Sequence, residues 1–219
     1  MRLQVLGSGS KGNCYLLSTD TETLILDAGI SVKEVKKALD FNISRISGLL
    51  VTHVHRDHSQ FADDFFYMGI PVIKPYSIKK IIGRLGSFVY QAFDLPHDDT
   101  ENYGYYIKIG NEKILYLTDF EYCKYNFSKL KVNHILVECN YQDEYVSENL
   151  INFNHKIIGH CSLETCKEFV RVNASEELKN VILIHLGDQS TNKNELVSAI
   201  KEVTNAKVYI AQKGLDIEL

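Results

Sequence analysis

Residues 49 to 58 read Leu49-Leu50-Val51-Thr52-His53-Val54-His55-Arg56-Asp57-His58. An apolar, β-branched run typical of a buried strand is followed directly by three imidazoles and a carboxylate. Side chains alternate in an extended segment, so the His-x-His spacing puts two imidazoles on one side, where they can bind one ion. Asp57 and His58 follow just past the turn and can reach a second ion. The stretch therefore predicts a metal site at the end of a strand rather than a histidine-rich surface loop.

Two ions need more ligands than this stretch offers, and the rest of the chain supplies candidates at the ends of apolar runs. Imidazole and carboxylate suit borderline divalent cations such as Zn²⁺ or Mn²⁺, and pairs of such ions ~3.5–4 Å apart hydrolyse phosphoesters and amides. A strand fixes its last residue while the following loop exposes it. The further candidates are Asp27 after residues 24–26, His97, Asp119 after residues 114–118, His160 in Gly159-His160-Cys161-Ser162, and His185 after residues 181–184.

Length and composition narrow the class of protein. With 219 residues, the chain is long enough for one substantial domain with a buried core, so we expect a single domain over residues 1–219. No apolar run approaches the ~18 residues of a membrane helix, so no membrane partner is expected. Five scattered cysteines without a C-x-x-C pair favour a reducing cytoplasm. The net charge of −4 argues against a chain-wide surface for long nucleic acid, although a local basic strip is compatible with it.

Strand-like and helix-like patterns alternate along the chain. Helices are predicted at residues 32–39 with Ser31 as N-cap, from Ser162 to about 171, and at 194–203. Strands are predicted at residues 3–6, 15–17, 24–26, 49–52, 71–73, 88–91, 105–109, 113–117, 135–138, 181–184, 207–210 and 215–218, with a hairpin at Gly110-Asn111. This order favours the α/β (α+β) class: two facing sheets with helices outside, a four-layer αββα sandwich.

The stretch Gly7-Ser8-Gly9-Ser10-Lys11-Gly12 matches the G-x-G-x-x-G pattern of dinucleotide-binding proteins, and Asp27 lies near the ribose-binding offset. A dinucleotide site needs a helix directly after the glycines, because the helix N-terminus holds the pyrophosphate. Here another strand pattern follows, Cys14-Tyr15-Leu16-Leu17. We therefore predict a tight turn between two antiparallel strands, whose backbone N–H groups could border the metal cleft.

These motifs, in this order, resemble those of metallo-β-lactamase-fold hydrolases along nearly the whole chain. The five family motifs match Asp27, the His53–His58 cluster, His97, Asp119 and a C-terminal histidine. The resemblance implies two divalent ions, Zn or Mn, as cofactors. One ion would be held by His53, His55 and His97, the other by Asp57, His58 and a late histidine, with Asp119 shared. Asp27 would orient the ligand loop through hydrogen bonds.

Several segments resemble the nuclease and phosphodiesterase side of this superfamily, particularly YycJ/WalJ-like proteins and, more distantly, RNase Z. They are residues 7–14, Val137-Glu138-Cys139-Asn140-Tyr141, Gly159-His160-Cys161-Ser162 and Ile184-His185-Leu186-Gly187. Class B1 β-lactamases carry cysteine and arginine where this chain has Asp119 and His58, so antibiotic hydrolysis is not expected.

The resemblance also assigns roles at the catalytic centre. It implies that His160 faces the scissile phosphate and that His185 binds metal, while spacing alone leaves the reverse assignment open. Glu138 would hold His160 in orientation. The predicted catalytic residues are therefore His160, Glu138 and Asp57. The two remaining histidines, His134 and His155, are expected to be a strand-start and a surface imidazole.

The predicted activity is phosphodiester hydrolysis by metal-activated hydroxide. Two alternatives stay open: a thioester hydrolase of the glyoxalase II type, and a non-catalytic metal-binding module. About twenty residues separate His97 from Asp119 and about forty separate Asp119 from His160, too few for the RNase Z arm or the RNase J clamp domain. The expected substrates are therefore DNA or RNA ends, short oligonucleotides or cyclic nucleotides, and a homodimer is left open. Among the aromatic residues, 65–67 and 103–106 are the best candidates to stack on bases.

Overall fold

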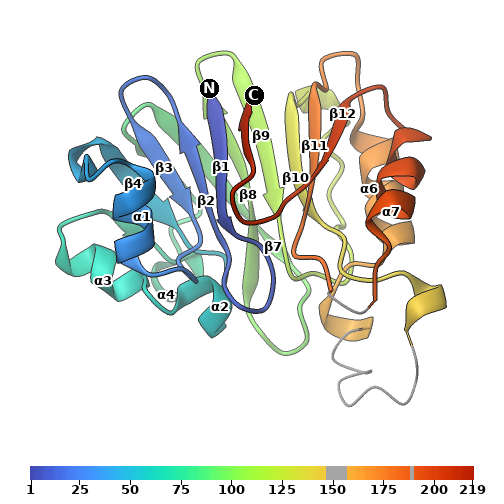
Figure 1. Cartoon of the computed structure of the whole chain (residues 1–219), viewed down its shortest axis with the longest axis horizontal. Helices are drawn as coiled ribbons and strands as arrows, with labels where there is room; N and C mark the ends of the chain where they lie inside the picture. Colours follow the sequence, from blue (N-terminus) through green and yellow to red (C-terminus); the bar gives the residue numbers. More distant parts are fainter. Residues whose placement is uncertain (147–156, 188–189) are drawn as a thin grey trace.

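The computed structural model describes residues 1–146, 157–187 and 190–219, in which two β-sheets pack face to face between outer helices (Figure 1). The first sheet has the strand order β13-β1-β2-β3-β4-β5, and the second has the order β12-β11-β10-β9-β8-β7-β6. The strands of the first sheet are β1 (Arg2–Gly7), β2 (Cys14–Ser18), β3 (Thr23–Leu26), β4 (Ile46–Leu50), β5 (Val72–Ile73) and β13 (Asp216–Glu218). Those of the second are β6 (Ile82–Leu85), β7 (Phe88–Leu95), β8 (Asn102–Ile109), β9 (Glu112–Leu117), β10 (His134–Glu138), β11 (Asn180–Ile184) and β12 (Lys207–Ile210).

Helices cover both outer faces. On the side of the first sheet lie α1 (Val32–Ala38), α2 (Arg56–Ser59), α3 (Ala62–Tyr67) and α4 (Pro75–Ile78). On the side of the second lie α6 (Leu163–Asn173) and α7 (Lys193–Lys201). The four-layer αββα prediction is therefore confirmed. Within the described part of the chain, no helix combines the length and apolarity needed to cross a membrane.

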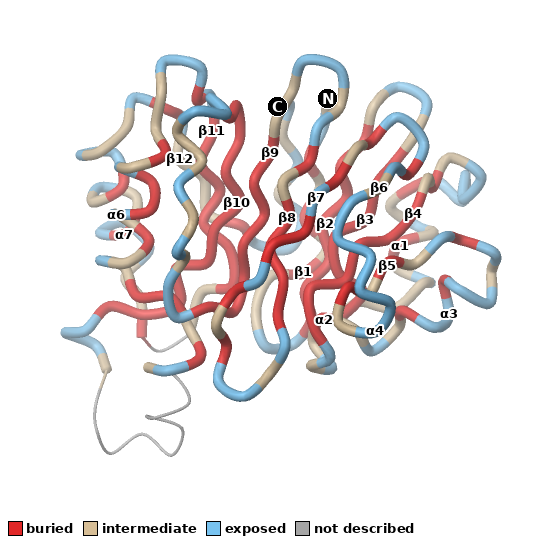
Figure 2. Tube along the Cα trace, turned by 180° about the vertical axis from the view of Figure 1, so that it is seen from behind, coloured by how far each residue is buried: buried red, intermediate tan, exposed pale blue. Residues whose placement is uncertain are grey.

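Three apolar clusters correspond to the three interfaces between these layers, and the strands are the most deeply buried part of the chain (Figure 2). Alternation along each strand divides its side chains between two clusters. In β2, Tyr15 and Leu17 face the opposite sheet, while Leu16 packs toward the helices. In β10, Leu136 faces the first sheet and Val137 packs toward α6 and α7. The two-residue period of the sequence thus fixes both faces of each sheet.

The predicted strands and the three predicted helices are present, with shifted ends. The strand predicted at residues 49–52 ends at Leu50, because the Thr52 N–H donates to the Asp27 carboxylate (2.8 Å) instead of continuing the ladder. The strand predicted at 88–91 continues to Leu95 along β8. The short edge strand β6 is mostly exposed and was not predicted, because it carries little apolar alternation.

The glycine-rich turn joins antiparallel strands β1 and β2, as predicted, with β2 directly after it rather than a helix. The Gly110-Asn111 hairpin also forms, between β8 and β9. His134 begins β10, as predicted, and its buried ring contacts Glu112 (3.0 Å). His155 lies outside the described residues.

Candidate metal centre

The candidate ligands gather where four strands end, along one edge of the sandwich. The His53–His58 segment follows β4, His97 follows β7, Asp119 follows β9 and His185 follows β11. The first segment comes from one sheet and the other three residues come from the facing sheet. The structure thus brings together residues that are far apart in sequence, because the register of both sheets places these strand ends at the same edge.

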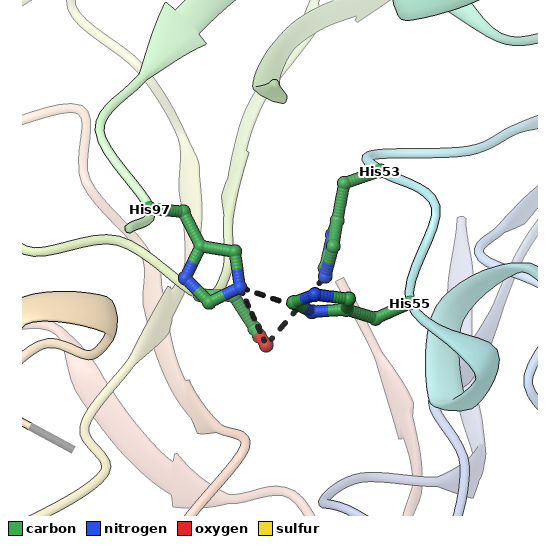
Figure 3. Close-up of side chains that lie close together, drawn as sticks. His53, His55 and His97 are labelled. Carbon is green, nitrogen blue, oxygen red and sulfur yellow. Dashed lines mark hydrogen bonds and ion pairs between the residues drawn. The ribbon is translucent and has the colours of Figure 1, made fainter. Parts of the chain in front are cut away.

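His53, His55, His97 and Asp119 form the first group, and Figure 3 shows its three imidazoles close together. One ligand atom from each residue lies within 4.8 Å of the others. The Oδ2 atom of Asp119 is 3.8 Å from His53 Nε2 and 3.9 Å from His97 Nε2. His97 Nε2 lies 3.1 Å from His55 Nδ1. This is the geometry of side chains that can converge on one cation.

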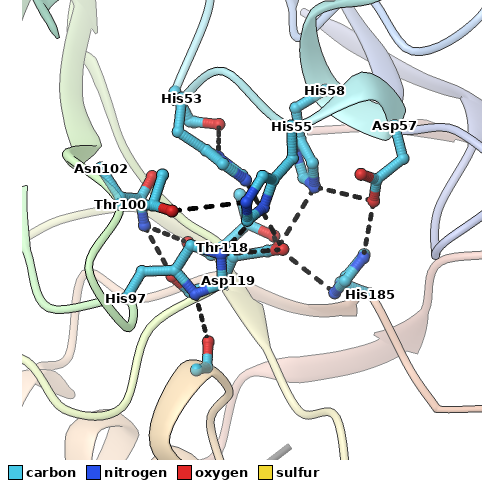
Figure 4. Close-up of polar contacts among 12 residues, drawn as sticks. His53, His55, Asp57, His58, His97, Thr100, Asn102, Thr118, Asp119 and His185 are labelled. Carbon is cyan, nitrogen blue, oxygen red and sulfur yellow. Dashed lines mark hydrogen bonds and ion pairs between the residues drawn. The ribbon is translucent and has the colours of Figure 1, made fainter. Parts of the chain in front are cut away.

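Asp57, His58, Asp119 and His185 form the second group, again within 4.8 Å (Figure 4). Here the other oxygen of Asp119 is used: Oδ1 lies 3.3 Å from His58 Nε2 and 3.2 Å from His185 Nδ1. Asp57 Oδ2 lies 3.3 Å from His58 and 3.4 Å from His185. The two oxygens of Asp119 therefore face different groups.

The donor set of the first group fits a divalent cation. His53 Nε2 is buried and has no hydrogen-bond partner among the described residues, although its Nδ1 lies 2.9 Å from the Thr52 hydroxyl. Burial, together with the nearby charge of His58, lowers the pKa of His53 well below its usual value, so the ring is neutral. A buried nitrogen without a hydrogen-bond partner costs free energy. The neutral Nε2 of His53, which lies near the Asp119 carboxylate, is therefore suited to bind a metal ion.

In the second group, His58 and His185 carry imidazole protons that a bound cation could replace. Burial lowers the pKa of His58, but the carboxylates of Asp119 and Asp27 outweigh it and raise the pKa overall. The same balance, again with Asp119, raises the pKa of His185 to about 10. In turn, His185 and His58 hold the pKa of the buried Asp119 well below its usual range. A divalent cation among these carboxylates would displace the imidazole protons, so binding should release protons.

Asp27 supports the cluster from below. Its Oδ2 contacts His58 Nδ1 (2.7 Å) and accepts a hydrogen bond from Tyr116 Oη (2.5 Å), and its Oδ1 accepts from Thr52 N (2.8 Å). With Nδ1 engaged by this carboxylate, His58 turns Nε2 toward Asp57 and Asp119. These are the contacts expected if Asp27 orients the ligand loop.

Glu138 lies between the two late histidines. Its Oε1 contacts Nδ1 of His160 (2.7 Å) and Nδ1 of His185 (2.8 Å), while Oε2 accepts from the N–H groups of Phe120 and Cys161 (both 3.1 Å). The carboxylate is buried; its burial raises the pKa, but His160 and His185 lower it overall. His185 also belongs to the Asp57 group, whereas His160 falls, among the described residues, in a third candidate group with Asp119, Glu138 and His185.

Three of these residues adopt a left-handed backbone conformation: Asp27 (φ 59°), Asp119 (φ 51°) and His185 (φ 51°). Asp27 and His185 come directly after a strand and Asp119 comes two residues after one, where a sharp change of direction aims the side chain across the sheet edge. Non-glycine residues adopt this conformation rarely, and at functional sites more than elsewhere.

Sequence reasoning did not assign several supporting residues. Asn13 Nδ2 lies 3.2 Å from Asp57 Oδ2 and 2.9 Å from His58 Nε2, and Tyr116 reaches Asp27 from β9. Only the position of Asn13, directly after the glycine pattern, gave a signal in the sequence. Of the proposed stacking aromatics, Tyr103 and Tyr105 are buried, whereas Phe66 and Tyr67 are exposed.

Residues 7–79 match the family model of the Metallo-beta-lactamase superfamily. The matched segment includes Asp27 and the His53–His58 cluster, so the chain resembles the metallo-hydrolases of this superfamily. The metallo-β-lactamase fold extends over the whole chain: the metallo-beta-lactamase fold protein YhfI of Bacillus subtilis superposes with a TM-score of 0.76 at 16% identity, covering 100% of this chain and 99% of that one. The short form of human tRNase Z superposes with a TM-score of 0.65 at 15% identity, covering 100% and 99%.

Among sequence relatives, the Exodeoxyribonuclease YycJ of Bacillus anthracis is 23% identical. The match covers 99% of this chain and 94% of the relative. The likeness therefore includes the late segment with His160 and His185 as well as the part matched by the family model.

Proposed function

We propose that this protein is a metallo-hydrolase that cleaves phosphodiester bonds in nucleic acid with two divalent ions, Zn or Mn. The observation that carries the proposal is the orientation of Asp119, whose two oxygens face two separate ligand groups 3.2 to 3.9 Å away. A carboxylate placed in this way suits a pair of ions rather than one. The relatives named exodeoxyribonuclease and tRNase Z support a nucleic acid substrate.

His53, His55 and His97 would hold one ion, and Asp57, His58 and His185 the other, with Asp119 shared. When bound, the ions would polarise the phosphoryl group and make water a better nucleophile. His185 contacts Glu138 through Nδ1, which leaves Nε2 on the side of Asp57. This pairing of a carboxylate with the far nitrogen of an imidazole is common for metal-binding histidines.

His160 would act on the substrate. Its Nδ1 is engaged by Glu138, so a proton for the leaving oxygen would come from Nε2. The His160 ring, the His55 ring and the Asp57 carboxylate are partly exposed, whereas the other candidate ligand side chains are buried. The substrate would therefore approach over His55, Asp57 and His160. Glu138, fixed by two backbone N–H groups, would keep His160 in place during the proton transfer.

Turnover of three substrates tests the proposal. Purified protein with Zn²⁺ or Mn²⁺ is assayed against bis-p-nitrophenyl phosphate, a single-stranded oligodeoxynucleotide labelled at either end, and S-lactoylglutathione. We expect hydrolysis of both phosphodiesters and none of the thioester. Turnover of the thioester alone would indicate an enzyme of the glyoxalase II type, and no turnover of any substrate at full metal loading would indicate a binding module.

A further inference from the structure

A cavity of about 390 Å³ opens beside the candidate metal centre. Its walls come from the β1–β2 turn, the residue after His185, the start of α7 and the segment after β12. Three lysines line it: Lys11 in the glycine-rich turn, Lys193 at the first position of α7, and Lys213. All three are exposed. The cavity is large enough for one nucleotide, since small-molecule sites begin near ~300 Å³.

The charge of this cavity differs from that of the chain as a whole. Among its described lining residues there is no carboxylate, although the chain carries a net charge of −4. None of the three lysines forms an ion pair with a described residue, and the nearby carboxylate of Glu34 is bonded to Lys37 (2.9 Å). By contrast, the cavity of about 650 Å³ beside Arg2 and Arg45 also contains Asp20, Asp40 and Asp216. The lysine-lined cavity is thus suited to an anion.

The cavity shares a wall with the second ligand group. Leu186 lines it directly after His185, and the Ser8 hydroxyl accepts a hydrogen bond from the His185 N–H (2.9 Å). Asn13, at the end of the same turn, contacts Asp57 (3.2 Å). An anion bound here would therefore lie next to the phosphate that is cleaved.

The glycine-rich turn is packed closely against neighbouring backbone. A Cβ atom on Gly7 would lie 2.3 Å from the Gly12 carbonyl oxygen, and one on Gly12 would lie 2.4 Å from that of Gly29. Gly12 also has φ 139°, which side chains disfavour. The turn is therefore packed against Gly29 and Ile30, and the Asn13 N–H that follows it donates to the Asp57 carbonyl oxygen (2.7 Å).

We propose that Lys11, Lys193 and Lys213 bind the backbone phosphates that flank the scissile bond of a single-stranded nucleic acid. The start of α7, a nine-residue helix capped by Asn192, adds the partial positive charge of a helix N-terminus to Lys193. This inference rests on the proposed function and narrows its substrate class, because a cyclic nucleotide or a simple diester has no flanking phosphate to place here.

The test replaces all three lysines with serine and uses a matched control. The control replaces Lys108, Lys201 and Lys207, which are also exposed and make no ion pair among the described residues. Lys207 pairs with the start of β11 and Lys201 ends α7, so these positions lie away from the metal centre. Both triple variants lose the same charge.

Binding of a fluorescent single-stranded oligothymidylate is measured first by anisotropy in EDTA, so this measurement does not depend on catalysis. We expect the Lys11/Lys193/Lys213 variant to bind roughly tenfold more weakly, with a shallower salt dependence of affinity, and the control variant to bind like the wild type. With metal added, the ratio of oligonucleotide turnover to bis-p-nitrophenyl phosphate turnover should also fall roughly tenfold in the Lys11/Lys193/Lys213 variant and stay unchanged in the control.

Equal binding by the two variants, or equal loss in both, would overturn the inference. If the wild type binds oligothymidylate through these lysines but turns over neither substrate, the lysine site stands and the proposed catalytic function fails. If both phosphodiesters are cleaved and the lysine variant keeps its substrate ratio and its affinity, the proposed function stands and the lysine site fails.

Discussion

Asp119 is the residue on which both ligand groups depend. It lies two residues past the end of β9, is buried, and is held by the Thr118 hydroxyl, which donates to Oδ1 (2.6 Å). The Asn102 amide donates to its carbonyl oxygen (2.6 Å) and fixes the backbone. The importance of Asp119 could be predicted from its place after an apolar strand, but the separate use of its two oxygens could not, because it depends on four partners distant in sequence.

Asp119→Ala should remove phosphodiester turnover and lower the metal content from about two ions per chain to fewer than one. Both ions would lose the ligand that they share, while the apolar clusters between the layers stay unchanged. Elemental analysis of metal-loaded protein gives the stoichiometry, and circular dichroism checks the fold. A wild type that binds only one ion, or a variant that retains most of its turnover, would contradict the shared-ligand arrangement.

The two late histidines should respond differently to removal. His185→Ala should lower metal content, because His185 lies within ligand distance of Asp57, His58 and Asp119. His160→Ala should keep both ions and lower oligonucleotide turnover ~10²–10⁴-fold, the usual effect of losing an acid or a charge-stabilising group. The His160→Ala substitution should lower turnover of bis-p-nitrophenyl phosphate less, because p-nitrophenolate leaves without a proton. Metal loss in the His160 variant alone would show that the two roles are reversed.

Elements with strong apolar alternation could be predicted from the sequence, and short elements could not. Strands β1, β2, β10 and β11 and helix α6 lie where their patterns place them. The four-residue helices α2 and α4 follow no helical period, because each is a single turn fixed by its neighbours. For the same reason, the sequence suggested Asp57 and His58 as candidate metal ligands but did not show that they lie on a helix.

The N-cap of α6 offers a test at this scale. Ser162 accepts a hydrogen bond from Thr165 N (3.1 Å), so Ser162→Ala should lower the free energy of unfolding by about 1 kcal/mol. Ser31, the N-cap of α1, makes no such side-chain bond, and Ser31→Ala is the matched control, expected within ~0.5 kcal/mol of the wild type. Urea denaturation of both variants measures the difference, and equal losses would show that the Ser162 bond contributes nothing specific.

For the molecule as a whole, the candidate metal centre lies between the two sheets at one edge. The His53–His58 segment belongs to the first sheet, and His97, Asp119 and His185 belong to the second. Bound ions would therefore act as cross-links between the two halves of the sandwich. The sequence predicted the two sheets and suggested the candidate ligands, but the placement of these residues on opposite sheets follows only from the strand order.

Metal binding should accordingly stabilise the fold. At a free metal concentration 100 times the Kd, one site adds about 2.7 kcal/mol, which corresponds to a rise in Tm of about 5–10 °C for a chain of this size. Differential scanning calorimetry with Zn²⁺ or Mn²⁺ and with EDTA measures this shift. Asp119→Ala should show a much smaller response, and an equal response in both proteins would place the stabilising metal elsewhere.

The left-handed backbone at Asp27, Asp119 and His185 lowers the stability of the fold, while the side chains at these positions serve the proposed reaction. For residues other than glycine this conformation costs roughly 1–2 kcal/mol, with aspartate the better tolerated of the two types present. Glycine would relieve that cost at each position and would delete a ligand or its support. Selection for thermal stability alone would favour glycine at these three positions. Their retention in a lineage would therefore record continued demand for the reaction itself.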